Sequence, residues 1–313
     1  MMTAPATQAA GRRARGTRPR LRAVLLEQVR ATGLALRGAA LVAAALLGLA
    51  TLLAVLQMAS GGVVTRHTWP TAVPGIMGVL LPIAVWARDE RFGAGFLWTL
   101  PVDRRRHAFT KVLAGWVWLM GGVALFALWL IALTLASGGP ALPVETLNVL
   151  TSPIPASGGV DPATLRTVPW VPGPLILAVP FTAATATYLL ASALALGTRH
   201  PLRWVIGIVL ANVFASMMSQ AASAQGGRVG WLADAPARAL EAIVVGRYGL
   251  DAMLTARAAS LDNHANLTTG ELVVVWSAVP ELAHWVIATL LWTGAGLLAL
   301  WAAASRHREG RRA

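Results

Sequence analysis

The chain has 313 residues, of which 56% are hydrophobic and only 12% are charged. Because soluble domains carry about 25% charged residues, this composition excludes an ordinary water-soluble fold and indicates an integral membrane protein. The absence of Cys excludes disulfides, thiolate metal sites and cysteine nucleophiles. The net charge of +13 does not indicate nucleic-acid binding, because the basic residues lie between apolar runs and near the two ends.

The first 37 residues precede the first apolar run. Residues 1–20 are rich in Arg, Ala, Gly and Thr, and we expect them to form a disordered basic tail. In residues 21–37, Leu and Val are interleaved with Arg and Glu in a pattern typical of an amphipathic helix at the membrane surface. The alternative for residues 21–37 is a simple helical extension of the first membrane span.

Six apolar segments follow, and none of them contains Asp, Glu, Lys, Arg or His. Each is near the ~17–25 residues needed to cross the hydrocarbon core, and the second and fifth are the shortest. We expect Pro82 and Pro180 to kink their helices without ending them, because neighbouring helices satisfy the freed carbonyls. Six Trp residues lie near predicted ends, as in an aromatic belt: Trp69, Trp86, Trp116, Trp170, Trp204 and Trp285. The six segments are residues 38–58, 71–87, 112–135, 175–196, 204–219 and 285–304.

The distribution of charge predicts the orientation. With the N-terminus inside, the cytoplasmic segments are residues 1–37, 88–111, 197–203 and 305–313, which hold 20 basic and five acidic residues. The outer segments hold six basic and eight acidic residues. Since cytoplasmic loops carry the excess of Lys and Arg, both termini are predicted to be cytoplasmic.

Two outer segments are long enough to carry structure. Residues 137–174 are rich in Pro and Gly, and we expect an irregular surface loop. Within residues 220–284, Asp234 can cap an amphipathic helix, and the apolar residues 272–279 are expected to dip into the outer leaflet. The alternative is a small, loosely packed loop domain. The predicted fold is therefore all-α: six transmembrane helices over residues 38–304, preceded by the interfacial helix, with a partly helical outer segment before the last span and a basic cytoplasmic tail over residues 305–313.

The residue types needed for several kinds of chemistry are missing. The chain has one Lys, Lys111, and no Gly-rich phosphate loop before it, so we do not expect it to hydrolyse ATP. Its six His residues do not cluster at metal-ligand spacing. The absence of charged groups within the spans argues against coupling to protons or sodium. Among polar residues at depth, Thr185, Asn212 and Ser216 are candidates for lining a substrate path, although helix packing is the commoner role of such groups.

The most strongly charged internal stretch lies between the second and third apolar segments. Residues 88–111 read RDERFGAGFLWTLPVDRRRHAFTK. Pro101 ends any preceding helix, and Asp103 is placed to cap a helix that continues into the third segment. The stretch also carries four apolar side chains, which we expect either to form a contact site in a cytoplasmic loop or to rest on the lipid headgroup layer: Phe92, Phe96, Leu97 and Trp98. The alternative is an ordinary basic loop between two spans.

The order of these parts resembles the ABC-2 type permeases, the membrane-spanning subunits of ATP-binding-cassette exporters. The specific match comprises an acidic pair, two glycines, a Leu-Pro turn and a basic residue entering the third span. Asp103 stands where such permeases usually have Ser or Thr, and it keeps the capping role. In this sequence, the match covers Asp89, Glu90, Gly93, Gly95, residues 97–103 (LWTLPVD), Arg104, Arg105, Arg106 and Lys111.

The resemblance implies a function and partners. The loop would dock on a separate cytoplasmic ATPase that binds ATP and Mg²⁺, and a second permease copy, identical or related, would complete the transporter. The expected location is the cytoplasmic membrane of a prokaryote, and the expected cargo is a hydrophobic or amphipathic compound. The alternatives are an ion-coupled secondary transporter and a non-transporting membrane scaffold. The residues implied in the ATPase contact are Asp89, Glu90, Arg91, Phe92, Phe96, Leu97, Trp98, Pro101 and Arg104.

Overall fold

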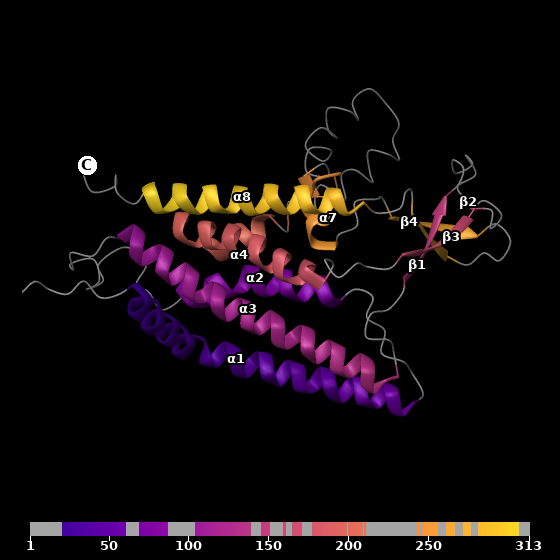
Figure 1. Cartoon of the computed structure of the whole chain (residues 1–313), viewed down its shortest axis with the longest axis horizontal. Coiled ribbons are helices and arrows are strands. Elements are labelled where there is room, and N and C mark those ends of the chain that lie inside the picture. The colour runs from indigo at the N-terminus through magenta and orange to yellow at the C-terminus, as the bar shows by residue number, and fades with distance from the viewer. Residues whose placement is uncertain are drawn as a thin grey trace, which may run out of the picture.

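The helices lie side by side as an elongated bundle, with a small sheet beyond one end of it (Figure 1). This computed structural model describes residues 21–60, 69–86, 104–138, 145–150, 159–160, 165–170, 177–198, 200–208, 210, 243–244, 246–255, 261–266, 272–276 and 281–306. Residues 1–20 and 307–313, for which we expect basic tails, lie outside these ranges. The bundle is built from the helices α1 (Leu21–Ala59), α2 (Trp69–Trp86), α3 (Arg104–Ala136), α4 (Val179–Gly197), α7 (Leu250–Thr255) and α8 (Leu282–Arg306).

Four of these helices are long and apolar enough to cross a membrane: α1, α3, α4 and α8. They coincide with the first, third, fourth and sixth predicted spans, so the chain is a mostly helical, membrane-embedded protein. The second predicted span corresponds to α2, which has 18 residues. The fifth predicted span lies mostly outside the described residues. Residues 201–208, which include the beginning of this span, are helical. That the chain crosses the membrane six times therefore stays a prediction.

Helix α1 is continuous over 39 residues. It joins residues 21–37 to the first span without a break, as in the alternative of a helical extension. Two indole N–H groups of α3 bind it, because Trp118 donates to the Val29 carbonyl at 2.9 Å and Trp129 donates to the Thr51 hydroxyl at 2.9 Å. Gly33 leaves room for the first of these rings, since a Cβ there would lie 2.4 Å from Trp118.

The core lies where α2, α3, α4 and α8 meet. Helix α4 runs between α2 and α8 (Figure 1), and its Ala183, Ala184 and Ala186 are fully buried. Small residues let the helix backbones approach closely, which is how membrane helices gain packing contacts. A Cβ at Gly78 of α2 would lie 2.6 Å from the Ala184 carbonyl oxygen. Close backbone approach therefore holds α4 in the centre of the bundle.

The two prolines expected to kink helices differ in position. Pro82 lies inside α2, together with Pro74, so it does not end the helix, as predicted. Pro180 instead lies in the first turn of α4, which begins at Val179. The first turn has no intrahelical acceptor for its N–H groups, so Pro is accommodated there without cost. The prediction of a kink at Pro180 is wrong, because the helix begins four residues later than residue 175.

A five-stranded sheet forms from the two outer segments, in the order β2-β4-β5-β1-β3. Strand β1 pairs antiparallel with β3 and parallel with β5, while β4 pairs antiparallel with β5 and parallel with β2. Leu147 of β1 and Val275 of β5 are buried. The strands are β1 (Glu145–Leu150), β2 (Gly159–Val160), β3 (Leu165–Trp170), β4 (Leu261–Asn266) and β5 (Leu272–Trp276).

This sheet corrects three predictions. The fold is not all-α, residues 137–174 are not wholly irregular, and residues 272–276 form a strand rather than a piece dipping into the leaflet. The apolar β5 is the central strand of the sheet, with β4 and β1 paired along its two edges, and its Val275 is buried. Trp170, expected near a membrane boundary, is the last residue of β3. The helix predicted after Asp234 lies mostly outside the described residues, but α7 confirms that this outer segment is partly helical.

Candidate functional site

Most of the predicted site residues lie outside the described part of the chain. Helix α2 ends at Trp86 and α3 begins at Arg104, where the capping role of Asp103 predicts a helix start. Thr185 is the one predicted site residue whose contacts are described. The residues outside the described ranges are Asp89, Glu90, Arg91, Phe92, Phe96, Leu97, Trp98, Pro101, Asp103, Asn212 and Ser216, and of Arg104 only the backbone is described.

The two ends of the charged loop are linked by a buried cation. Lys111 of α3 is only 7% exposed, and its ammonium lies 4.6 Å from the ring centroid of Trp86, the last residue of α2. Burying a charge is costly unless it is paired. A desolvated ammonium over an indole gains about 2 kcal/mol, which offsets part of that cost. Lys111 and Trp86 therefore connect the end of α2 to the beginning of α3.

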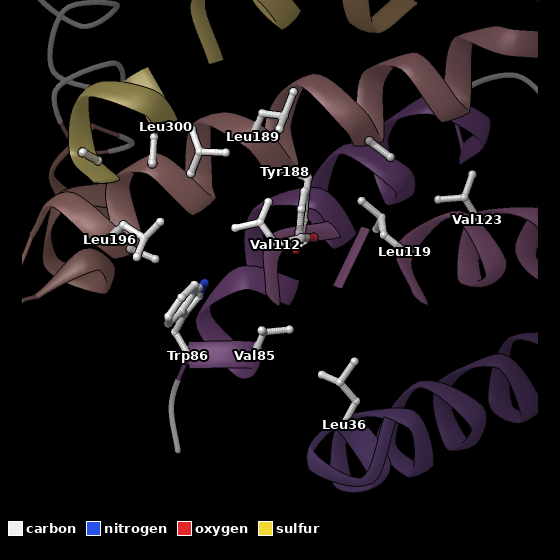
Figure 2. Close-up of a cluster of buried hydrophobic side chains, with 14 residues drawn as sticks. Leu36, Val85, Trp86, Val112, Leu119, Val123, Tyr188, Leu189, Leu196 and Leu300 are labelled. Carbon is white, nitrogen blue, oxygen red and sulfur yellow. Dashed lines mark hydrogen bonds between the residues drawn. The ribbon is translucent and has the colours of Figure 1, made fainter. Parts of the chain in front are cut away.

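The next residue of α3 is bonded to the central helix. Tyr188 of α4 has no exposed surface and donates its hydroxyl to the Val112 carbonyl oxygen at 2.7 Å. Figure 2 shows the ring of Tyr188 pointing from α4 toward Val112, with Val85 and Trp86 of α2 nearby. Gly115 makes the approach possible, because a Cβ there would lie 2.3 Å from the Tyr188 hydroxyl oxygen. We call Trp86, Lys111, Val112 and Tyr188 the helix joint.

A second hydrogen bond supports the joint one turn further along α3. Trp116 donates its indole N–H to the Thr185 hydroxyl oxygen at 3.1 Å, and that hydroxyl donates to the Phe181 carbonyl oxygen at 2.7 Å. Thr185 was predicted as a candidate for lining a substrate path. Its hydroxyl instead joins α3 to α4, which is the helix-packing role named as the alternative. The sequence shows a Trp and a Thr within two different apolar segments. Their spacing along the chain does not reveal that the two side chains are bonded to each other.

A separate polar group lies at the end of the bundle next to the sheet. Arg247 donates its Nε–H to His284 Nε2, and His284 Nδ1 lies 3.5 Å from a Glu281 carboxylate oxygen. The Tyr248 ring lies 5.6 Å from the imidazole, between centroids, and Trp292 of α8 donates to the Tyr248 carbonyl at 3.1 Å. We call Arg247, Tyr248, Glu281 and His284 the Arg247 cluster. Sequence reasoning missed it because Arg247 and His284, which join its two halves, are 37 residues apart.

Neither group has the composition of a metal centre. Within the described ranges, no group of three or more His, Asp or Glu side chains is arranged to hold a metal ion. No family model, curated protein or solved structure matches the chain. The functional argument therefore rests on the membrane-embedded helices, the helix joint and the charged loop that the joint flanks.

Proposed function

We propose that this chain is the membrane permease subunit of an ABC transporter, which exports a hydrophobic or amphipathic compound using ATP hydrolysed by a separate subunit. The observation that carries the proposal is the helix joint. It links the two ends of a charged loop to each other, through Lys111 and Trp86, and to the central helix, through Val112 and Tyr188. A loop anchored in this way is suited to receive force from a partner.

The joint provides a route from the loop to the membrane helices. A partner that moves residues 87–103 would displace the end of α2 and the beginning of α3 together, because the Lys111 ammonium lies over the Trp86 ring. Since Val112 follows Lys111 directly and accepts the hydrogen bond of Tyr188, α4 would move with them. Helix α4 packs against both α2 and α8 (Figure 1). Such packed helices shift between discrete arrangements rather than deform continuously.

The remaining parts of the proposal concern partners and location. The sequence has no phosphate-binding loop, so ATP and Mg²⁺ would be bound by a cytoplasmic ATPase subunit. A second copy of this chain, or a related permease, would complete the transporter. The protein would lie in the cytoplasmic membrane of a prokaryote with both termini inside. An ion-coupled transporter or a scaffold would need no such ATPase, and this difference separates the alternatives.

The experiment is co-purification with the candidate ATPase subunit, together with ATP hydrolysis and export assays. The isolated chain should hydrolyse no ATP. Phe96→Asp would bury a carboxylate without a partner if Phe96 fills a groove of the ATPase, at a cost of several kcal/mol. Since ~1.4 kcal/mol is tenfold in binding, the complex should loosen by about two orders of magnitude or more.

The matched control is Thr99→Asp, which adds the same charge to the same loop at a polar position. It should weaken the complex far less than Phe96→Asp, and both variants should insert into the membrane in wild-type amounts. Wild-type co-purification and export by Phe96→Asp would show that the loop is merely a linker. Robust ATP hydrolysis by the isolated chain would contradict the proposal that a separate subunit hydrolyses ATP.

A further inference from the structure

The guanidinium of Arg247 is held in one orientation by a buried imidazole. His284 is only 9% exposed and lies in the first turn of α8. Its Nε2 accepts the Nε–H of Arg247, so the imidazole carries its hydrogen on Nδ1, the nitrogen that faces Glu281. Arg247 itself is exposed. With Nε fixed, the four N–H groups of its two terminal nitrogens remain as a planar fork, and among the described residues no hydrogen bond or ion pair engages them.

The fork lies next to the beginning of α8, which is also the beginning of a candidate membrane span. Helix α8 begins with Leu282, and its next turns expose the apolar side chains of Val286 and Ile287, which are 41% and 45% exposed. These side chains face outward from a helix that is long and apolar enough to cross a membrane. Glu281 and His284 lie at the very start of the same helix, and Arg247 is hydrogen-bonded to His284 there. Phospholipid headgroups occupy this level of a bilayer, just outside the hydrocarbon core.

We infer that the Arg247 cluster is a binding site for a phosphate group, supplied by a phospholipid headgroup at the membrane surface. A planar guanidinium fork matches the oxygens of a phosphate and binds them through two parallel hydrogen bonds. The Tyr248 ring lies beneath the guanidinium, 5.8 Å from its central carbon, and supports its plane. The inference requires only that α8 crosses the membrane, and it stands independently of the proposed transport function.

Charge decides between a lipid phosphate and a free phosphate ion. The cluster contains one guanidinium and one carboxylate, Glu281, whose side chain is 66% exposed, so its attraction for a dissolved anion is weak. A phosphate that belongs to a membrane lipid is already confined to the same surface. Its effective concentration is therefore high enough for a single oriented guanidinium to bind it. Glu281 lies against the far nitrogen of the imidazole and orients His284 rather than the lipid.

The test uses the full chain, purified in detergent, and counts bound dioleoyl-phosphatidylglycerol by native mass spectrometry during a lipid titration. Arg247→Gln should weaken the tightest-bound lipid about tenfold or more, the value expected for losing a charge-assisted hydrogen bond. Arg247→Lys keeps the charge without the fork and should weaken it by a smaller factor. His284→Phe changes no formal charge but removes the acceptor that orients Arg247, so it should also weaken binding. Arg203→Gln, at an exposed arginine in helix 201–208, is the matched control and should not change it.

Several outcomes would overturn the inference. Wild-type lipid retention by Arg247→Gln would show that the guanidinium does not bind the headgroup. An equal effect of Arg203→Gln would show nonspecific attraction to basic residues. Displacement of the lipid by millimolar inorganic phosphate would assign the site to free phosphate and contradict the lipid assignment. Unchanged elution and melting temperature of Arg247→Lys would exclude misfolding as the cause of its weaker binding.

Discussion

Adding one methyl group at Gly115 tests the helix joint directly. A Cβ at this position would lie 2.3 Å from the Tyr188 hydroxyl oxygen, 3.3 Å from the adjacent ring carbon and 3.4 Å from Val85 Cγ2. Because Tyr188 is fully buried in a close-packed core, moving its ring disturbs the side chains packed around it. Gly115→Ala should therefore displace the ring and break its bond to the Val112 carbonyl. Gly121→Ala is the matched control, since the same helix has nothing within 4 Å of a Cβ there.

The expected change in the free energy of unfolding combines two destabilising effects and one stabilising effect. Overpacking a close-packed site costs about 1–3 kcal/mol, and losing the Tyr188 hydrogen bond costs about 1 kcal/mol. Replacing Gly with Ala inside a helix returns about 1 kcal/mol. Gly115→Ala should therefore lower the free energy of unfolding by about 1–3 kcal/mol. The control, Gly121→Ala, retains only the favourable effect and should be as stable as the wild type or more stable.

A third variant identifies the atom responsible for the cost. Tyr188→Phe removes the hydroxyl oxygen and leaves the ring carbon at 3.3 Å as the nearest atom to the new methyl group. The cost of Gly115→Ala should therefore fall in the Phe background, and the two substitutions should be non-additive. The assay is denaturant or thermal unfolding, in the same detergent, of the wild type, Gly115→Ala, Gly121→Ala, Tyr188→Phe and the double variant Gly115→Ala/Tyr188→Phe. Equal stability of Gly115→Ala and Gly121→Ala, or an unchanged cost in the Phe background, would refute the geometry of the joint.

The remaining predictions concern the joint, the helix packing and the topology. Lys111→Glu would bury an uncompensated carboxylate against the Trp86 ring and should cost several kcal/mol, seen as a loss of folded protein in detergent-solubilised membranes; wild-type yield would contradict this. Gly78→Leu should destabilise the bundle by more than 1 kcal/mol, because even a Cβ there lies 2.6 Å from a backbone oxygen of α4; an unchanged melting temperature would contradict the close approach. Since the chain has no Cys, single cysteines at Arg199 and Asn266 can be labelled selectively. The first should react only from the cytoplasm and the second only from outside, and labelling at position 199 from outside would refute the predicted topology.

The spans were predictable because a membrane helix is a local property of the chain. About twenty apolar residues in a row satisfy their own backbone and match the bilayer thickness without any distant partner. The sequence therefore locates α1, α3, α4 and α8. The start of α3 at Arg104 was also predictable, since a cap acts within one turn. Neither prediction requires knowledge of which helices are neighbours.

The sheet was not predictable for the opposite reason. Val149 of β1 is paired with Trp276 of β5, and this register depends on residues more than a hundred positions apart. The Pro- and Gly-rich composition of residues 137–174 indicates turns, and it hides the short strands between them. Strand β5 is a short apolar run, and such a run alone does not distinguish a buried strand from a membrane segment. The Arg247 cluster escaped prediction in the same way, because its contacts join distant segments.

The hydrogen-bonding side chains inside the spans determine which helices pair, and composition does not predict those pairs. Lipid tails are as apolar as leucine, so hydrophobicity does not decide which membrane helices pair, and interhelical hydrogen bonds and close packing do. Trp118 and Trp129 bind α3 to α1, while Trp116 and Tyr188 join α3 and α4. Trp is the residue type found both in aromatic belts and as a hydrogen-bond donor between helices, so a Trp near the end of an apolar run fits both roles. Only the position of the acceptor on another helix separates the two. Substituting Trp129 by Phe keeps its apolar surface and removes the N–H that binds Thr51, so α1 should loosen from α3 while membrane insertion is preserved.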